Sequence, residues 1–166
     1  DVTFPRVAGT SVPTDFVELP AQIYEHWLGQ STILTRFAVH HQTGEPIPKA
    51  LLDRLMAARN FNQGFATVEF LSSAFVDLDV HMMTGVDAAT FDIDAAERDT
   101  LARLQMPAEI VCRHRPTHFG HIFAGGYSAG YYSYMWSEVL DADGFEAFKE
   151  TGDIFDKATA SRLRQH

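Results

Sequence analysis

The sequence predicts an all-α fold with at most a minor β element, and three observations support this prediction. Apolar residues recur at helical spacing in most segments, and the longest such run covers residues 62–83. Glycines and prolines lie between these runs, where they end one helix or open the next. A strand is considered only for residues 108–115, an ambiguous stretch between Pro107 and Pro116. Helical signals therefore dominate the chain.

The N-terminal half is expected to form a loop followed by four helices. These elements are predicted at residues 1–13, 16–28, 31–41, 48–58 and 62–83. Thr14 or Asp15 can cap the first helix, and Pro20 is tolerated there because it lies near the helix start. Pro48 can occupy the first position of the third helix, where its missing N–H costs nothing.

The longest predicted helix carries an apolar stripe that includes Phe65 and Val68 and is wide enough to be largely buried. Gly85 ends this helix, and an acidic connector follows it. Further helices are predicted at residues 94–105, 127–140, 145–150 and from 156 onward, with a turn at 141–144. Asp94 and Asp156 supply side chains that can cap two of these helices.

Length and charge restrict the domain count and the partners. With 166 residues, of which 46% are hydrophobic, we expect residues 1–166 to form a single, partial domain with a sizeable core. The chain has 13 basic and 22 acidic residues and a net charge of −9, and its only small basic cluster is Arg113 with Arg115. A nucleic-acid partner is therefore not expected, because a phosphate backbone requires a basic surface.

Cysteine usage and hydropathy restrict the location. The single Cys112 cannot form an internal disulfide, which fits a reducing compartment and predicts a cytoplasmic location, with the periplasm as the alternative. We expect this cysteine to be a small packed residue. No segment approaches the roughly 18 consecutive apolar residues of a membrane span, so no membrane partner is expected.

A glycine- and tyrosine-rich stretch is the most informative part of the chain. Gly125 and Gly126 let the backbone adopt positive φ or approach a ligand closely. A phenol donates a hydrogen bond and keeps its proton near neutral pH. Helical spacing would place Tyr127, Tyr131 and Tyr134 on one face, aimed at a polar substrate under the loop. The alternative is that these aromatic residues simply pack in the core.

Metal-ligating residue types occur at two places. His114, His118 and His121 partly resemble the spacing of the helical zinc motif H-E-x-x-H. A zinc site made of these three is not favoured, because Pro116 interrupts the helix and no glutamate follows His114. Glu18 has an apolar neighbour on each side and can point inward, where metal ligation would satisfy its charge. The alternative for Glu18 is an ordinary glutamate that faces solvent in the first turn of a helix.

Two stretches together carry a family resemblance: GTSVPTDFVELPAQIYEHW at residues 9–27 and HIFAGGYSAGYYSYMW at residues 121–136. They closely resemble the thimet oligopeptidase family of zinc metallopeptidases, and within it the bacterial peptidyl-dipeptidase branch. The resemblance implies the C-terminal part of a helical, zincin-like catalytic domain. It also implies an enzyme that hydrolyses short peptides and releases dipeptides from their C-termini.

The resemblance assigns roles to residues in both stretches. Glu18 corresponds to the third zinc ligand of the family. His121, Tyr131 and Tyr134 match residues that bind substrate or stabilise the tetrahedral intermediate, and residues 125–127 match the mobile glycine-rich loop. The chemistry is consistent, because a neutral phenol and an imidazole can donate hydrogen bonds to an oxyanion.

An arginine just before the loop is a further candidate for substrate binding. Arg115, or its neighbour Arg113, could pair with the terminal carboxylate of a peptide through a bidentate guanidinium fork. This interaction would suit an enzyme that releases dipeptides from a free C-terminus. The alternative is a surface arginine without a role in binding.

The chain departs from the family in one respect. Such enzymes carry H-E-x-x-H roughly two dozen residues before the third ligand, and this motif supplies two of the zinc ligands and the general base. Here 17 residues precede Glu18, and none of them is histidine. We therefore expect a fragment, with zinc bound in the full-length enzyme. The chain alone is expected to bind zinc negligibly and to be inactive.

The expected partners follow from this interpretation. They are short peptide substrates and the N-terminal part of the same enzyme. Self-association is also expected, through apolar surface that would normally meet that part. The alternative function is a non-catalytic helical peptide-binding or interaction module without a metal, which an upstream H-E-x-x-H would argue against.

Overall fold

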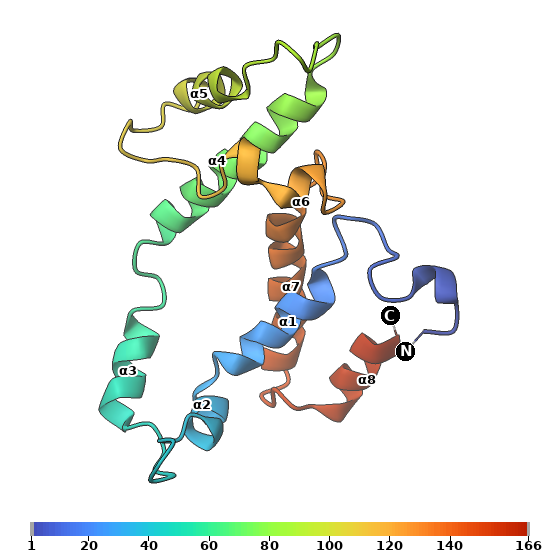
Figure 1. Ribbon diagram of the computed structural model, residues 1–166. Helices are drawn as coiled ribbons and strands as arrows, with labels where there is room; N and C mark the ends of the chain where they lie inside the picture. Colours follow the sequence, from blue (N-terminus) through green and yellow to red (C-terminus); the bar gives the residue numbers. More distant parts are fainter. Residues whose placement is uncertain (1, 166) are drawn as a thin grey trace. The chain divides into compact units, whose positions relative to one another are not determined.

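The computed structural model describes residues 2–165, and over these residues the fold is all-α, as predicted (Figure 1). Its α-helices and two 3-10 helices (η) are η1 (Pro5–Val7), α1 (Leu19–Leu28), α2 (Ser31–Phe37), α3 (Lys49–Ala57), α4 (Gln63–Met82), α5 (Ile93–Arg103), η2 (Pro116–His118), α6 (Gly120–Phe123), α7 (Ser133–Lys149) and α8 (Lys157–Gln165). The β element is minor: within residues 2–165 it is an isolated antiparallel bridge between Val39 and Pro46.

The chain separates into two compact units. The first unit comprises Asp1–Phe61 and Met135–His166, and the second comprises Asn62–Tyr134. The first therefore contains α1, α2, α3, α8 and nearly all of α7, whereas the second contains α4, α5 and α6. The prediction of a single, partial domain stays a prediction.

The core of the first unit lies between α1 and α7. Ile23 of α1 packs against Phe145 and Phe148 of α7, and all three side chains are buried. Trp27 meets both phenylalanine rings edge to face, at centroid distances of 4.7 and 4.9 Å. Its indole N–H also donates to the carbonyl oxygen of Ile154 at 2.8 Å. Burial of these large aromatic side chains is what joins the N-terminal and C-terminal segments of this unit.

Helix α7 runs without a break through residues 141–144, so the predicted turn at this position is wrong. The aspartates and glycine there are typical of turns, but tertiary contacts hold them in the helix. Asp141 pairs with His26 of α1. A side chain at Gly144 would place its Cβ 3.0 Å from the Cδ1 atom of Ile23, so glycine permits the close approach of the two helices.

The first two helices are shorter than predicted. Helix α1 begins at Leu19 rather than residue 16, because residues 14–18 form turns, and neither predicted capping residue bonds to its N-terminus. Helix α2 ends at Phe37, because the chain then turns back into the bridge between Val39 and Pro46. The proline after the start of α1 is accommodated in its first turn, as predicted.

The second unit is built on α4 and α5, which pack against each other (Figure 1). The contact includes a polar link, because Asp79 of α4 accepts a hydrogen bond from the Thr100 hydroxyl at 2.6 Å and pairs with Arg103. The cap of α5 is Asp92, whose side chain accepts from the N–H of Ala95 at 2.9 Å, and not Asp94 as predicted.

Two further expectations for this unit are corrected. The apolar stripe of α4 is not largely buried, because Phe65 is 50% exposed and Val68 is 47% exposed near the N-terminal end. Burial is concentrated in the following turns, which include Ala74 and Val76. Residues 108–115 contain no strand, and their backbone forms a turn and a bend before η2.

Candidate active site

Four of the predicted site residues come together as a group of rings, which we call the tyrosine cluster: His121, Tyr127, Tyr131 and Tyr134. The His121 ring centroid lies 6.0, 5.7 and 6.2 Å from the centroids of the three tyrosines, in chain order. Tyr134 stacks on Tyr127 at 5.4 Å and meets Tyr131 edge to face at 5.4 Å. An imidazole and three phenols therefore concentrate hydrogen-bonding groups in one place.

The backbone that brings the three tyrosines together is not the predicted helix. Helix α7 begins only at Ser133, so Tyr127 and Tyr131 lie in the preceding loop and do not share a helical face with Tyr134. The loop turns tightly, with the N–H of Gly130 donating to the Tyr127 carbonyl at 2.8 Å. A succession of turns thus replaces the predicted helix and still brings the rings together.

The two adjacent glycines serve the path of the loop. Gly126 has a φ of +84°, a conformation that favours glycine. At Gly125 an added Cβ would lie 2.9 Å from the Cα atom of His121, so only glycine lets the loop fold back onto α6. The N–H of Tyr127 then donates to the His121 carbonyl at 3.1 Å. The observed close approach is to the protein's own backbone, and a contact of Gly125 or Gly126 with substrate stays a prediction.

Burial sets the ionisation of Tyr131. Loss of solvent around the phenol, together with the neighbouring Tyr134, raises its pKa above the ordinary value of a tyrosine. Its ring meets Phe119 edge to face at 4.6 Å and stacks on Phe70 of α4 at 5.1 Å. Tyr131 therefore remains a protonated hydrogen-bond donor at neutral pH.

His114 adjoins the cluster, although the sequence pattern gave it no catalytic role. Its ring stacks on Phe119 at 5.1 Å, and its centroid lies 5.9 Å from that of His121. Burial, the positive charge of Arg113 and the neighbouring His121 lower the pKa of His114. A second imidazole that favours its neutral form therefore lies beside the predicted one. Its sequence signal was the four-residue spacing to His118, which resembled a metal motif.

Asp77 of α4 was missed entirely. The side chain is completely buried and accepts hydrogen bonds from the backbone N–H groups of Ala129 and Tyr131, both at 2.9 Å. The only local signal is an acidic residue within the apolar run of a helix, which indicates a buried charge that needs partners.

Arg115 lies between two acidic side chains of α5. Its Nε and Nη2 atoms lie 2.9 Å from Glu97 and 2.8 Å from Asp94, respectively. The hydrogen bond and charge of Glu97 are the main reasons why the pKa of Arg115 is raised. A substrate carboxylate would have to compete with both of these groups, and its binding by Arg115 stays a prediction.

Cys112 is a packed residue, as predicted. It is 3% exposed, and its sulfur lies 3.8 Å from the Ser72 hydroxyl. Burial raises the pKa of the thiol, which disfavours the nucleophilic thiolate. The side chain therefore has the environment of a structural cysteine.

Glu18 is the predicted metal ligand and belongs to the first unit. It is half-buried and occupies the position immediately before α1. Within residues 2–165, no group of three or more His, Cys, Asp or Glu side chains could hold a metal ion. Ligation of a metal by Glu18 stays a prediction.

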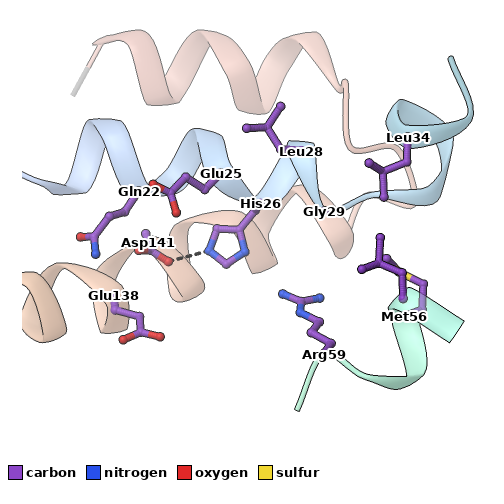
Figure 2. A pocket seen from close by; sticks show the side chains of 11 residues that line it. Gln22, Glu25, His26, Leu28, Gly29, Leu34, Met56, Arg59, Glu138 and Asp141 are labelled. Atoms are coloured by element: carbon purple, nitrogen blue, oxygen red, sulfur yellow. Dashed lines mark hydrogen bonds and ion pairs between the residues drawn. The ribbon is translucent and has the colours of Figure 1, made fainter. Parts of the chain in front are cut away.

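The first unit also contains a cavity of about 450 Å³ that none of the predicted site residues lines (Figure 2). Its polar lining consists of Gln22, Glu25, His26, Arg59, Glu138 and Asp141. Figure 2 shows Arg59 on the segment after α3, and the three acidic side chains on α1 and α7. The lining thus combines acidic groups with one arginine, and the His26–Asp141 pair forms part of its wall.

Comparison with known proteins identifies the family. The model of peptidase family M3 matches residues 2–166. The chain belongs to this family. It is 39% identical to a dipeptidyl carboxypeptidase of Escherichia coli over 153 residues, 91% of this chain and 22% of that protein. It is also 40% identical to oligopeptidase A of E. coli over 160 residues, 92% of this chain and 22% of that protein. These matches confirm the resemblance seen in the sequence.

The match covers only part of the length of each relative. The chain spans about a fifth of the length of the curated relatives that it matches, since 22% of each is covered. Family M3 peptidases are metallopeptidases, so a metal cofactor is implied for the family. Across the described residues, no helix has the length and apolar character needed to cross a membrane.

Proposed function

We propose that this chain supplies the substrate-facing side of a zinc-dependent peptidase that hydrolyses short peptides and releases dipeptides from their C-termini. The observation that carries the proposal is the tyrosine cluster, in which an imidazole and three phenols meet on a segment matched by the family model. Membership in peptidase family M3 supports the reaction class. Two relatives named dipeptidyl carboxypeptidase support the release of dipeptides.

His121, Tyr131 and Tyr134 are the proposed catalytic residues. Peptide hydrolysis develops negative charge on the scissile carbonyl oxygen, and a fixed hydrogen-bond donor stabilises that charge. Burial of Tyr131 raises its pKa, which favours the protonated phenol that can donate such a hydrogen bond. Removing one donor of this kind typically lowers kcat by about 10²–10³-fold.

Gly125, Gly126 and Tyr127 are the proposed substrate-binding loop, and Arg115 is the proposed partner of the substrate's terminal carboxylate. The proposed binding role of the loop is supported by the stacking of Tyr127 on Tyr134 within the tyrosine cluster. Arg115 is a weaker candidate, because two carboxylates already contact its guanidinium group. Substrate binding there would need Arg115 to exchange at least one of these contacts.

Zinc is the proposed metal, and Glu18 is proposed as one of its ligands. A glutamate oxygen is a normal zinc ligand, but a catalytic zinc site needs three protein ligands and one open position. The remaining ligands would come from outside the described residues. Zinc supplies polarisation of a carbonyl group and activation of water when it is bound at such a site.

Location and domain organisation are also proposals. A cytoplasmic location is supported by one relative named as a cytosolic oligopeptidase A, although another relative is named as chloroplastic or mitochondrial. We propose that the two compact units are parts of one catalytic domain.

Self-association of the isolated chain is supported by exposed apolar side chains such as Leu28 and Phe61, which are 66% and 80% exposed. Sedimentation of the isolated chain as a monomer at high concentration would contradict that last proposal.

The experiment compares two neighbouring tyrosines in the full-length enzyme. Tyr134→Phe removes a hydroxyl from the tyrosine cluster, and Tyr132→Phe removes one from a 41% exposed side chain outside it. With an N-terminally blocked peptide, we expect dipeptide release in both, with kcat about 100-fold lower for Tyr134→Phe and nearly unchanged for Tyr132→Phe. Mass spectrometry of the products identifies the released dipeptide. Peptide binding without any cleavage by the full-length protein would instead support a non-catalytic binding module.

A further inference from the structure

A single buried carboxylate holds two peptide groups of the loop that carries the tyrosines. The two side-chain oxygens of Asp77 accept from different residues: Oδ1 from the N–H of Ala129 and Oδ2 from the N–H of Tyr131, each at 2.9 Å. The donors lie 52 and 54 residues further along the chain. Asp77 therefore fixes the loop to α4 at two successive points.

The loop needs such support because its backbone is locally unfavourable. Ala129 has a φ of +55°, the left-handed conformation that costs a residue with a Cβ atom free energy relative to glycine. A side chain of the loop also bonds at this place, since the Ser128 hydroxyl donates to the Ile122 carbonyl at 2.5 Å. Bonds on both sides of Ala129 thus maintain a conformation that the residue would not adopt alone.

The anchored loop determines where the phenol rings lie. The Tyr131 N–H bonds to Asp77, while its ring packs on Phe70, which lies on the same helix as Asp77. The same ring meets His121 at 5.7 Å and Tyr134 at 5.4 Å. A shift of the Tyr131 backbone would therefore move the ring that contacts both other catalytic candidates.

His81 completes the surroundings of the carboxylate. Its Nδ1 atom lies 2.8 Å from Asp77 Oδ1 and 2.9 Å from the Asp77 carbonyl oxygen, one turn earlier on α4. Both neighbours accept hydrogen bonds, so Nδ1 carries a proton and donates it. Asp77 thus has three donors and no exposed surface, so hydrogen bonds satisfy its buried oxygens.

We propose that Asp77 is a positioning residue for the tyrosine loop in the peptidase reaction, with His81 as its supporting donor. The inference rests on the proposed function, because the loop has a catalytic role only if the tyrosine cluster acts on substrate. Asp77 itself is buried and does not touch substrate. It acts by holding Tyr131 and Ala129 in the geometry that the transition state requires.

Asp77→Asn in the full-length enzyme is the first test. The amide matches the carboxylate in shape, but its NH₂ group cannot accept one of the two loop N–H groups. We expect kcat to fall at least tenfold with KM changed less than threefold, because the misplaced donors act mainly in the transition state. Asp79→Asn is the matched control, since Asp79 lies two residues away on α4 and contacts α5 instead of the loop. The control should retain kcat within twofold.

A second variant keeps the inference testable if Asp77→Asn does not fold. His81→Gln removes one donor to the Asp77 carboxylate and leaves both loop hydrogen bonds to Asp77 in place. Because only the support of the carboxylate is lost, we expect a smaller fall in kcat, about threefold, in a folded enzyme. A folded Asp77→Asn enzyme with kcat within twofold of wild type would overturn the proposal. If Asp77→Asn does not fold, unchanged kcat in His81→Gln would overturn it. Failure of the proposed function is a separate result, because it appears as an unchanged kcat in Tyr134→Phe.

Discussion

Each unit contains a buried pair between a histidine and an aspartate, and the two pairs are alike in distance and exposure. In the first unit His26 Nε2 lies 2.5 Å from Asp141 Oδ1, and in the second His81 Nδ1 lies 2.8 Å from Asp77 Oδ1. The aspartate side chains are 4% and 0% exposed, and the histidine side chains 21% and 20%. The pairs differ in what they connect.

The His26–Asp141 pair connects two helices that are far apart in the sequence. Its imidazole stacks on Phe145 at 4.8 Å, so the pair is continuous with the aromatic core between α1 and α7. The His81–Asp77 pair lies within α4, and the aspartate gives its remaining acceptor capacity to the tyrosine loop. The same chemical pair therefore supports packing in one unit and loop placement in the other.

The largest effect on stability is expected from replacing the aromatic partners of the two histidines. Phe145 is 3% exposed and stacks on His26, whereas Phe123 is 54% exposed and lies 5.4 Å from His81. Phe145→Ala should lower the free energy of unfolding by about 3–5 kcal/mol, because it leaves a cavity in the core. Phe123→Ala should change it by less than about 0.5 kcal/mol. Urea denaturation followed by circular dichroism gives both values, and similar losses would break the comparison.

The histidines themselves are the next test. His26→Gln removes a contact between α1 and α7 and should lower the free energy of unfolding by about 2–3 kcal/mol, because the buried Asp141 acceptor loses its donor. His81→Gln removes a contact between residues one helical turn apart and should cost about 1 kcal/mol. Thermal unfolding of both variants at the same pH measures the difference. A larger loss for His81→Gln would show that the second pair is the more important for stability.

The ionisation of Tyr131 gives a smaller, pH-dependent effect. Burial raises its pKa, so in the unfolded chain this phenol ionises at a lower pH than in the folded protein. The associated stability is present below the ordinary tyrosine pKa of about 10 and is lost as the pH rises through the folded-state pKa. Absorbance titration of the tyrosines should show a late-ionising phenol that is lost in Tyr131→Phe. Identical titration curves for the two proteins would contradict the buried position.

The smallest expected effect concerns the cap of α8 in the first unit. The Asp156 side chain accepts from the N–H of Thr159 at 2.7 Å, and this bond is the main reason why the pKa of Asp156 is lowered. The stabilisation is therefore present above the ordinary aspartate pKa and is lost as the pH falls through the folded-state pKa. Asp156→Ala should lower the urea midpoint slightly at pH 7, and the difference should vanish in acid. A difference that persists in acid would argue against the cap.

Local patterns predicted those parts of the fold that local interactions determine. The long helix was expected at residues 62–83 and is found at Gln63–Met82, and Asp156 caps α8 as expected. The pattern failed at residues 141–144, where turn-forming residues stay helical because Asp141 and Gly144 contact α1. A local sequence pattern cannot predict a contact with a residue more than a hundred positions away.

The same limit applies to the candidate site. The sequence motif indicated which residues belong together, but the helical row predicted for Tyr127 and Tyr131 was wrong, because turns around Ala129 replace the helix. Asp77 was missed because its function depends on loop residues 52 and 54 positions away. Its acidic side chain in an apolar run indicated a buried charge without identifying the partner.

Amide hydrogen exchange of the tyrosine loop tests the central claim, that Asp77 holds the loop whereas Asp141 serves packing. The full-length enzyme, Asp77→Asn and Asp141→Asn are compared by mass spectrometry of peptides covering residues 127–132. Loss of a hydrogen bond worth about 1.4 kcal/mol corresponds to roughly tenfold faster exchange, which we expect for Asp77→Asn and not for Asp141→Asn. Equal exchange of this loop in the two variants would contradict the claim.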